Sequence, residues 1–483
     1  MSSWPDSAFG GPLETFDVGG GGFGQMSRSQ MQDLWKAMAA GQDIANPGTA
    51  AGQGFPYRVE SLDKMMRYVS FRDDHVRFFT SLVKQQAFNT VEEWNLNEDY
   101  GENVGGFIAE GDLPEEHDHT VSRNYAVVKY LATLRRATHP LQLIRPSHGN
   151  VVRQIAEAGT LWLLRAAENA CFNGDSRVIS EEWDGIRAQL EMAVDNGTAE
   201  SDVIRDMRGA YLTEEEVNEQ VGVRRASPNF AVPTHLYYSL KAHTQFTNQF
   251  YPKERYNIAA PAGSIEGGFD MSAFRSVHAP RPIVLEPDVF IQEGAVAPLT
   301  SSGSTAKIPG SPTVATPVDT ALVGAEVSQF GASDAGTYIW QIAAVNRYGK
   351  SKPTITAGVA ITANQKAVIA ITNPGGATGY EIYRTAVGGA AATARFCIRI
   401  PAAAGGGVTT FTDFNDDLPG TSTAYMVQKT EEALTFKQLA PMLKIPLARV
   451  DLSDRWAQVL YGMLILNIPR RHMIFKNVGT LAP

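Results

Sequence analysis

Apolar side chains recur every three or four residues between Val151 and Phe172, the spacing that predicts one face of a long helix. We expect four residues of this face to lie in the core: Ile155, Ala158, Trp162 and Ala166. Asn150 is a favourable N-cap residue, and Gly174 supplies a stop because glycine adopts the left-handed cap without a steric penalty. About 22 residues at ~1.5 Å each predict a helix of roughly 33 Å. Weaker helical patterns cover residues 212–221 and 233–243.

A strand-like alternation runs from Tyr125 to Leu131, and it follows a window of unusual charge. Residues 92–118 hold ten carboxylates and no Lys or Arg, whereas residues 119–156 hold six basic residues and no acid. We interpret this region as a long two-stranded ribbon, acidic on the outgoing limb and basic on the return. An isolated hairpin is marginally stable in water, so the ribbon needs a surface to lie on.

The opposite charges of the two limbs allow two interpretations. The limbs could pair with each other, although exposed ion pairs contribute only about 0–1 kcal/mol each. Alternatively, the acidic limb of one copy lies on a basic surface of the next copy, and charge complementarity sets the register. The second interpretation makes eight residues candidates for contacts between subunits: Glu102, Glu110, Asp112, Glu115, Glu116, Arg123, Arg135 and Arg136.

The composition changes in residues 301–425, where 15 of 125 residues, or 12%, are charged, against 22% elsewhere. Short alternating runs between turn signals predict an antiparallel β-sandwich there. In one of these runs, alternation places four residues on one face: Tyr338, Trp340, Ile342 and Ala344. Apolar and aromatic character resumes in residues 426–483, so we interpret the sandwich as an insertion into a fold that these residues complete. Residues 1–60 are rich in Gly, and we interpret them as an N-terminal arm.

Candidate chemistry is sparse. The formal net charge of −9 is unusual for a protein that binds nucleic acid by neutralising phosphates. Two cysteines exclude a disulfide scaffold or a four-cysteine zinc site, and they fit a protein folded in a reducing cytosol. P-loop, zinc-protease and nucleophile-elbow motifs are absent from the sequence. The metal-like cluster at residues 115–119 lacks a third ligand at a recognisable spacing, so we expect no metal, no cofactor and no enzyme.

Several segments, taken in order, carry a resemblance to a known family. They are Phe107-Ile108-Ala109-Glu110-Gly111, Arg135-Arg136-Ala137-Thr138-His139-Pro140, Phe172-Asn173-Gly174-Asp175-Ser176, Trp183-Asp184-Gly185-Ile186, residues 438–444, and Lys476-Asn477-Val478-Gly479. Over residues 60–300 and 425–483 the chain resembles the major capsid protein of tailed bacteriophages. The segment around residues 338–351 is similar to an immunoglobulin-like or fibronectin type III-like sandwich.

The resemblance implies an α+β capsid fold with an inserted all-β domain. Residues 1–60 would be the N-terminal arm, and residues 61–300 the peripheral and axial domains. Within these, residues 90–130 would form an extended loop and residues 150–173 a spine helix. Residues 301–425 would be the inserted immunoglobulin-like sandwich, and residues 426–483 would complete the peripheral domain.

The resemblance also implies a function. Copies would assemble into hexamers and pentamers of an icosahedral head in the host cytoplasm, and the virion would hold double-stranded DNA without sequence-specific binding. Further implied partners are a separate scaffolding protein, a portal and cement proteins, with no membrane. The extended loop has no Lys between residues 92 and 118, which argues against the covalent crosslink of some family members. An encapsulin-like compartment and a surface adhesin are the alternatives.

Overall fold

The computed structural model describes residues 15–16, 26–27, 72–101, 107–113, 116–143, 150–250, 271–291, 293–304, 306–449 and 451–479. The chain divides into two units, residues 1–68 with 145–149, and residues 69–144 with 150–483. In the first unit, β1 (Thr15–Phe16) pairs antiparallel with β2 (Met26–Ser27). The rest of the predicted arm lies outside the described residues. All that follows concerns the second unit.

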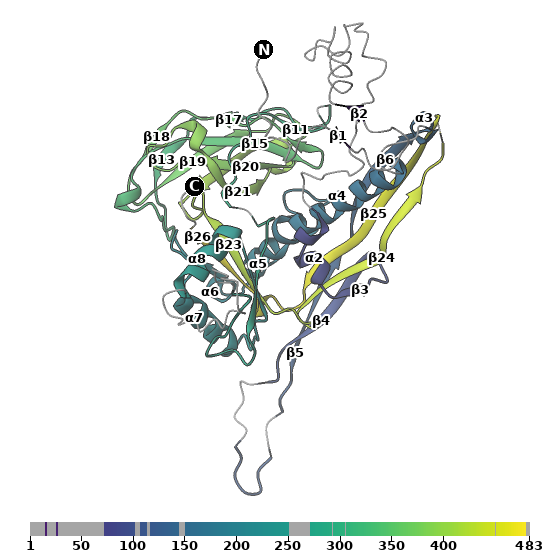
Figure 1. Cartoon of the computed structure of the whole chain (residues 1–483). Helices are drawn as coiled ribbons and strands as arrows, with labels where there is room; N and C mark the ends of the chain where they lie inside the picture. Colours follow the sequence, from purple (N-terminus) through teal and green to yellow (C-terminus); the bar gives the residue numbers. More distant parts are fainter. Residues whose placement is uncertain are drawn as a thin grey trace. The chain divides into compact units, whose positions relative to one another are not determined.

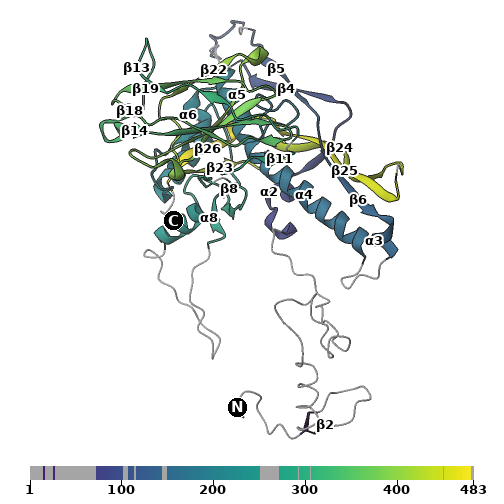
Figure 2. The same ribbon diagram turned by 90° about the horizontal axis from the view of Figure 1, so that it is seen from above.

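One sheet of the second unit joins strands that are far apart in the sequence. Its order is β3 (Lys84–Gln86), β24 (Leu434–Pro446), β25 (Ser453–Leu466) and β6 (Lys129–Thr138). Helix α4 (Val151–Asn173) lies along one face of this sheet, as Figures 1 and 2 show. Gln458 of β25 donates to the carbonyl oxygen of Ala156 in that helix at 2.9 Å. The C-terminal strands therefore complete a layer that the earlier residues began.

A second sheet carries the smaller helices. Its order is β7 (Ile204–Asp206), β26 (Met473–Val478), β23 (Ser422–Val427), β8 (His235–Tyr238), β10 (Ile283–Pro287) and β9 (Ala273–Phe274). The accompanying helices are α5 (Ile186–Asp195), α6 (Glu200–Val203), α7 (Glu214–Arg225) and α8 (Leu240–Phe250). The helix predicted over residues 233–243 is wrong in its first half, because residues 235–238 form a strand between two neighbours. The helix predicted over residues 212–221 is confirmed as α7.

Short elements precede and flank helix α4. They are η2 (Asp73–His75), α2 (Phe78–Ser81) and α3 (His139–Leu143). The aromatic side chain of Phe78 packs against Phe172 near the end of α4, with ring centroids 4.9 Å apart. Together the sheets and helices give the mixed α+β fold that the sequence predicted.

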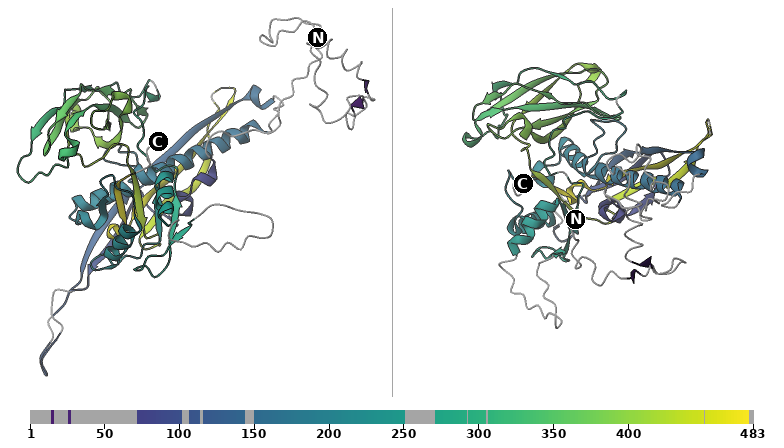
Figure 3. Two further views of the ribbon diagram at one scale, coloured as in Figure 1. Left: turned by 60° about the vertical axis from the view of Figure 1, so that its left-hand side comes forward. Right: turned by 45° about the horizontal axis from the view of Figure 1, so that its top comes forward.

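Residues 302–413 form two facing sheets (Figure 3). The first sheet contains β11 (Ser302–Gly303), β16 (Gly349–Lys350), β15 (Trp340–Asn346), β20 (Gly379–Arg384), β21 (Arg395–Pro401) and, beside β15, β17 (Thr354–Ile355). The second contains β12 (Thr313–Val314), β19 (Gln365–Thr372), β13 (Val318–Ala321) and, beside β19, β22 (Val408–Asp413). A separate pair joins β14 (Gly336–Tyr338) to β18 (Val359–Ile361). Side chains from both sheets share one core, including the predicted face of Tyr338, Trp340, Ile342 and Ala344.

The predicted end of the insertion at residue 425 is wrong by a few residues. Strand β23 begins at Ser422 and pairs with β26 and β8, so it belongs to the body. The composition change misplaced this boundary because β23 is itself short and apolar. The two linkers of the insertion meet where Glu293 forms an isolated bridge with Ser422. An inserted domain requires its two linkers to lie close together in this way. The similarity of residues 301–425 to immunoglobulin-like domains stays a prediction.

Helix α4 has the predicted limits but buries a different face. The side chain of Asn150 accepts hydrogen bonds from the backbone nitrogens of Val152 and Arg153, at 2.9 and 3.3 Å, which confirms the N-cap. Of the predicted core face, Ala158 and Trp162 are exposed, the latter at 43%, while Ile155 and Ala166 are half-buried. The buried face contains instead Gly159, Leu163, Ala167, Glu168, Cys171 and Phe172.

Two glycines explain how α4 meets its neighbours. A side chain at Gly159 would collide with the Gln458 amide, so this glycine lets the helix approach β25 closely. Gly174 has φ −63°, so the left-handed cap predicted from the sequence is wrong. Glycine is needed there for space, since a Cβ would collide with the carbonyl oxygen of Trp183.

Candidate assembly surface

The predicted ribbon is present as β4 (Val91–Asp99) paired antiparallel with β5 (Thr120–Val127). The strand continues into β6 after Val128, which is buried and donates a backbone hydrogen bond to Thr90 at 2.8 Å. At this point the chain leaves the ribbon and enters the sheet beneath α4. The single strand predicted through residues 125–131 is therefore two strands with different partners.

The base of the ribbon is fixed to the body by a few side chains. Trp94 packs against the main core, and its indole nitrogen donates to the carbonyl oxygen of Asn467 at 3.4 Å. Glu92 accepts from the backbone nitrogen of Phe88 at 2.8 Å and pairs with Lys437 at 3.1 Å. Burial opposes ionisation of Glu92, but these hydrogen bonds outweigh burial and lower its pKa. The base is thus a defined anchor.

Beyond this anchor the ribbon extends away from the two body sheets (Figure 1). Its limbs stay together as far as Gly101, which has φ +83° and whose carbonyl oxygen lies 3.1 Å from the His117 ring nitrogen. Large apolar side chains along the ribbon are exposed: Tyr100, Phe107, Ile108, Leu113, Val121 and Tyr125. An exposed apolar series of this kind marks an interaction site more often than a free surface.

The described members of the eight predicted contact residues do not form one cluster. Glu110, Asp112 and Glu116 are exposed on the ribbon, while Glu102 and Glu115 lie outside the described residues. Arg123 pairs with Glu93 across the ribbon at 3.3 Å, so the limbs do pair at this position. This basic residue of the return limb therefore forms an ion pair within its own ribbon.

Arg135 and Arg136 lie on opposite faces of β6. The Arg135 side chain points to α4, where its Nε atom lies close to Gly159. Arg136 is exposed on the other face and pairs with Asp451 at 3.4 Å. Alternation along a strand accounts for this separation, because neighbouring residues face opposite sides. The half-buried side chain of Arg135 therefore faces α4, and its role between subunits stays a prediction.

The face of the β6 sheet opposite α4 exposes apolar side chains that no described helix covers. It contains Tyr130, Leu134, Leu443 and Ile445. Tyr130 packs edge-to-face on Tyr461 of the adjacent strand, with ring centroids 5.2 Å apart. The sequence analysis did not identify this face, although the alternation of apolar and polar residues over 129–138 predicts a strand with one apolar face.

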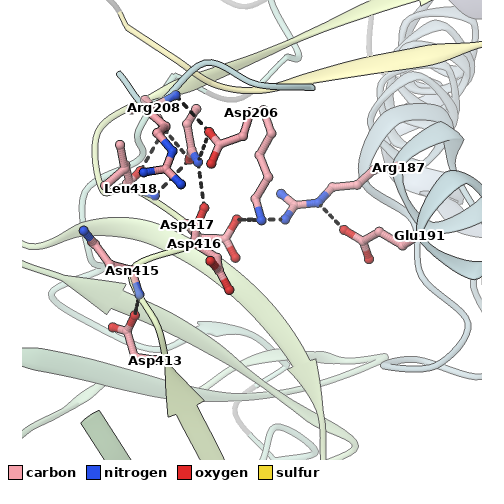
Figure 4. A network of polar contacts seen from close by, with 12 residues as sticks. Arg187, Glu191, Asp206, Arg208, Asp413, Asn415, Asp416, Asp417 and Leu418 are labelled. Carbon is pink, nitrogen blue, oxygen red and sulfur yellow. Dashed lines mark hydrogen bonds and ion pairs between the residues drawn. The ribbon is translucent and has the colours of Figure 1, made fainter. Parts of the chain in front are cut away.

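The insertion is tied to the body by ion pairs around one linker (Figure 4). Asp417 accepts from Arg187 of α5 at 3.3 Å and from Lys476 of β26 at 3.1 Å. Burial opposes the charge of Arg187, but the carboxylates of Glu191 and Asp417 outweigh it and raise the Arg187 pKa. On the insertion side, the buried Arg384 pairs with Asp413 at 2.7 Å. The linker thus connects the core of the insertion to charges of the body.

A second contact joins the insertion to the loop after α4. Arg347 pairs with Glu181 at 2.9 Å, and Arg399 pairs with Glu182 at 3.0 Å. Val178 and Ile179 pack against Val345 beside these pairs. The insertion is therefore fixed at two places.

Other chemical features are limited. Among the described residues, no group of three or more His, Cys, Asp or Glu side chains could hold a metal ion. Cys171 and Cys397 are buried, and burial raises the pKa of both thiols. Within the same described ranges, no helix has the length and apolar character to cross a membrane.

Comparison with known proteins gives consistent relatives along almost the whole chain. It is 22% identical to the major capsid protein of Staphylococcus phage K, over 93% of this chain and 96% of that protein. It is 24% identical to the putative major capsid protein of Enterococcus phage phiEF24C, over 88% of this chain and 90% of that protein. The chain is a relative of phage major capsid proteins. The resemblance to major capsid proteins that the sequence predicted is thereby confirmed.

No protein-family model matches the chain. Among solved structures, the chain is similar to the capsid of a native GTA particle, with a TM-score of 0.45 and 9% identity, covering 89% of this chain and 98% of that one.

Proposed function

We propose that this chain is the structural shell protein of a tailed-phage head. The observation that carries the proposal is its similarity to phage major capsid proteins along 93% of its length. Its activity would be assembly into hexamers and pentamers of an icosahedral shell, without an enzymatic step. The shell would form in the host cytoplasm, enclose double-stranded DNA without sequence-specific contacts, and require a separate scaffolding protein and a portal.

The ribbon is the part of the chain best suited to bind a second copy. Its anchor is half-buried against its own body, whereas Tyr100, Phe107 and Leu113 expose apolar side chains further out. Full burial of one such side chain contributes about 1.5–3 kcal/mol. Contacts of this kind run head to tail, so they close into rings at a suitable rotation.

The uncovered face of the β6 sheet is a suitable receiving surface on the neighbour. It combines the exposed apolar residues Tyr130, Leu134 and Leu443 with the exposed Arg136. The acidic ribbon residues Glu110, Asp112 and Glu116 would find a positive charge there, and charge complementarity would set the register.

Charge reversal at the ribbon tests this proposal. We expect Glu110→Lys with Glu116→Lys to leave the subunit folded, because both residues are exposed to solvent. The same variant should form no closed shells in negative-stain microscopy, because like charges would face each other at the contact. Size-exclusion chromatography and circular dichroism would show a folded, unassembled subunit.

The control for that experiment is the pair Glu110→Asp and Glu116→Asp, which preserves the charge at both positions. These variants should assemble as the unaltered chain does. Normal shells from the Lys variant would contradict the charge-based register. Failure of the unaltered chain to form any particle, alone or with its scaffolding protein, would contradict the shell function itself. Nucleic acid inside particles made in infected cells, rather than protein cargo, would separate a phage head from an encapsulin-like compartment.

A further inference from the structure

Strand β22 of the inserted sandwich has one free edge. It pairs with β19 from Val408 to Asp413, and no strand within the described ranges pairs with its other side. The side chain of Thr410 is exposed, and that of Val408 is 56% exposed. An unpaired edge of this kind presents a row of backbone donors and acceptors that can bind another strand.

The backbone groups that face this edge follow from the pairing of β19. The carbonyl oxygen of Ala370 accepts from the backbone nitrogen of Ala315 at 2.9 Å, on the side of β19 away from β22. Thr410 lies opposite Ala370, so these two residues exchange no hydrogen bond, and the N–H and C=O groups of Thr410 point to the free edge. Alternation along the strand directs the same groups of Val408 and Thr412 to that edge.

Other edges of the sandwich are protected against such pairing. In the same sheet, Pro312 precedes β12 and Pro317 precedes β13. In the other sheet, β21 ends at Pro401, and its first residue, Arg395, forms a bridge with Val296 of the entering linker. Strands β11 and β17 have two residues each. Proline, short length and cover by another segment are common protections of sheet edges.

Strand β22 lacks these protections. Its sequence is Val408-Thr409-Thr410-Phe411-Thr412-Asp413, without proline or lysine. Its one charged residue, Asp413, is 7% exposed and pairs with Arg384 inside the sandwich at 2.7 Å. The valine and the threonines favour extended backbone. The free edge is therefore suited to bind a further strand.

We propose that β22 binds the same strand of a second copy of this chain, antiparallel, about a two-fold axis at Thr410. Val408 of one copy then lies opposite Thr412 of the partner subunit, and the outward N–H and C=O groups of both strands pair. Such a contact between identical strands is self-complementary. Each β22 continues after Asp413 into its own body, so the two bodies lie beyond opposite ends of the pair. This contact does not depend on the ribbon or on the assembly proposed for it.

Charge favours a second copy as the partner. Residues 301–425 contain eight Lys or Arg and seven Asp or Glu, so the insertion is nearly neutral within a chain of net charge −9. Two insertions can therefore approach each other without the repulsion that two like-charged domains would experience. Pairing of such short strands is a small contact, so many copies held close together would strengthen it.

The surroundings of β22 leave room for the incoming strand. Phe411 and Thr412 line a cavity of about 330 Å³ that is also lined by Val194 of α5. The partner would bring its residues 402–407 to this end of the strand, because they precede Val408. All of these residues are Ala or Gly, so they bring little bulk to the space beside the body.

Disulfide formation in the full chain tests the pairing. In Thr410→Cys the two new thiols would face each other across the two-fold axis, with Cα atoms about 5.5 Å apart. A disulfide spans that separation. Cys171 and Cys397 are buried, so they should not compete. With a mild oxidant we expect a covalent dimer on a non-reducing gel, from concentrated subunits and from shells.

The matched control is Thr313→Cys, an exposed threonine on the opposite edge of the same sheet, which should stay monomeric. Absence of the Thr410→Cys dimer from both preparations would overturn the proposal. Equal dimer formation by Thr313→Cys would do the same, because random collision would then explain the crosslink. Failure to form shells bears on the shell function and leaves the crosslink of free subunits measurable.

A proline at the edge gives a second test. Val408→Pro, added to Thr410→Cys, should lower the rate of dimer formation about tenfold or more, because each copy loses an outward N–H group. Proline is tolerated at the first residue of a strand, so the insertion should stay folded, as circular dichroism would show. Val408→Thr keeps the N–H group and should preserve the rate. A rate that Val408→Pro leaves unchanged would contradict pairing through this edge.

Discussion

At the scale of single residues, local spacing alone does not decide which face of α4 is buried. Residues 155, 158, 162 and 166 and residues 159, 163, 167 and 171 both satisfy helical spacing. The choice between them depends on Gly159, which lets the Gln458 side chain of a distant strand approach the helix. Sequence reasoning predicted the helix and its Asn150 cap from local residues. It could not predict the buried face, because the deciding contact is about 300 residues away along the chain.

The two faces give opposite expectations for truncation. Leu163→Ala should lower the free energy of unfolding by about 2–5 kcal/mol, because its side chain is fully buried and would leave a cavity. Trp162→Ala should cost about 1 kcal/mol or less, since that side chain is 43% exposed. Urea denaturation of the unassembled subunit measures both. A larger loss for Trp162→Ala than for Leu163→Ala would contradict the observed face.

At the scale of elements, the junctions between helices and strands depend on close backbone approach. Gly185 precedes α5, and a Cβ there would lie 2.7 Å from the carbonyl oxygen of Ala170 and 2.9 Å from that of Cys171. The ribbon shows a related limit of prediction. Its charge and alternation predicted two strands, but the change of partner at Val128 depends on a hydrogen bond to Thr90 that alternation alone does not reveal.

Gly185→Ala should therefore destabilise the subunit by about 1–3 kcal/mol, because backbone atoms must move to admit the methyl group. Its backbone φ of −77° suits any residue, so the loss would be steric and not conformational. Gly407→Ala is the matched control, with φ −69° and no atom closer than 3.9 Å to the added carbon. Thermal unfolding should show a lowered melting temperature for the first variant and little change for the second.

At the scale of the whole molecule, the second unit joins a body to an inserted sandwich. The composition of residues 301–425 predicted the sandwich and the resumed fold, because weakly charged, alternating runs differ from the flanking sequence. The end of the insertion was misplaced, since the strand that begins at Ser422 has a similar apolar character. The described members of the eight predicted contact residues lie apart for a related reason. Tertiary position, rather than charge along the chain, decides which residues share a surface.

Removal of the insertion tests its independence. Joining residue 295 to residue 420 should leave a folded body, because Gly294 and Gly420 already lie side by side. Val178 and Ile179 lose their contact with Val345 in this variant, so both are replaced by Ser to keep the subunit soluble. We expect a lower melting temperature, from the lost Asp417 pairs, together with intact shells in microscopy. An unfolded or insoluble body would contradict an independent insertion.

The closeness of the two linkers also has a practical meaning. A Cβ on Gly294 would lie 2.5 Å from the Cα of Gly420, so the body presents both chain ends at one point. A foreign domain whose own termini are adjacent could be grafted there by gene fusion. Each particle would then present that graft once per subunit, in a spacing set by the lattice and not by chemical coupling.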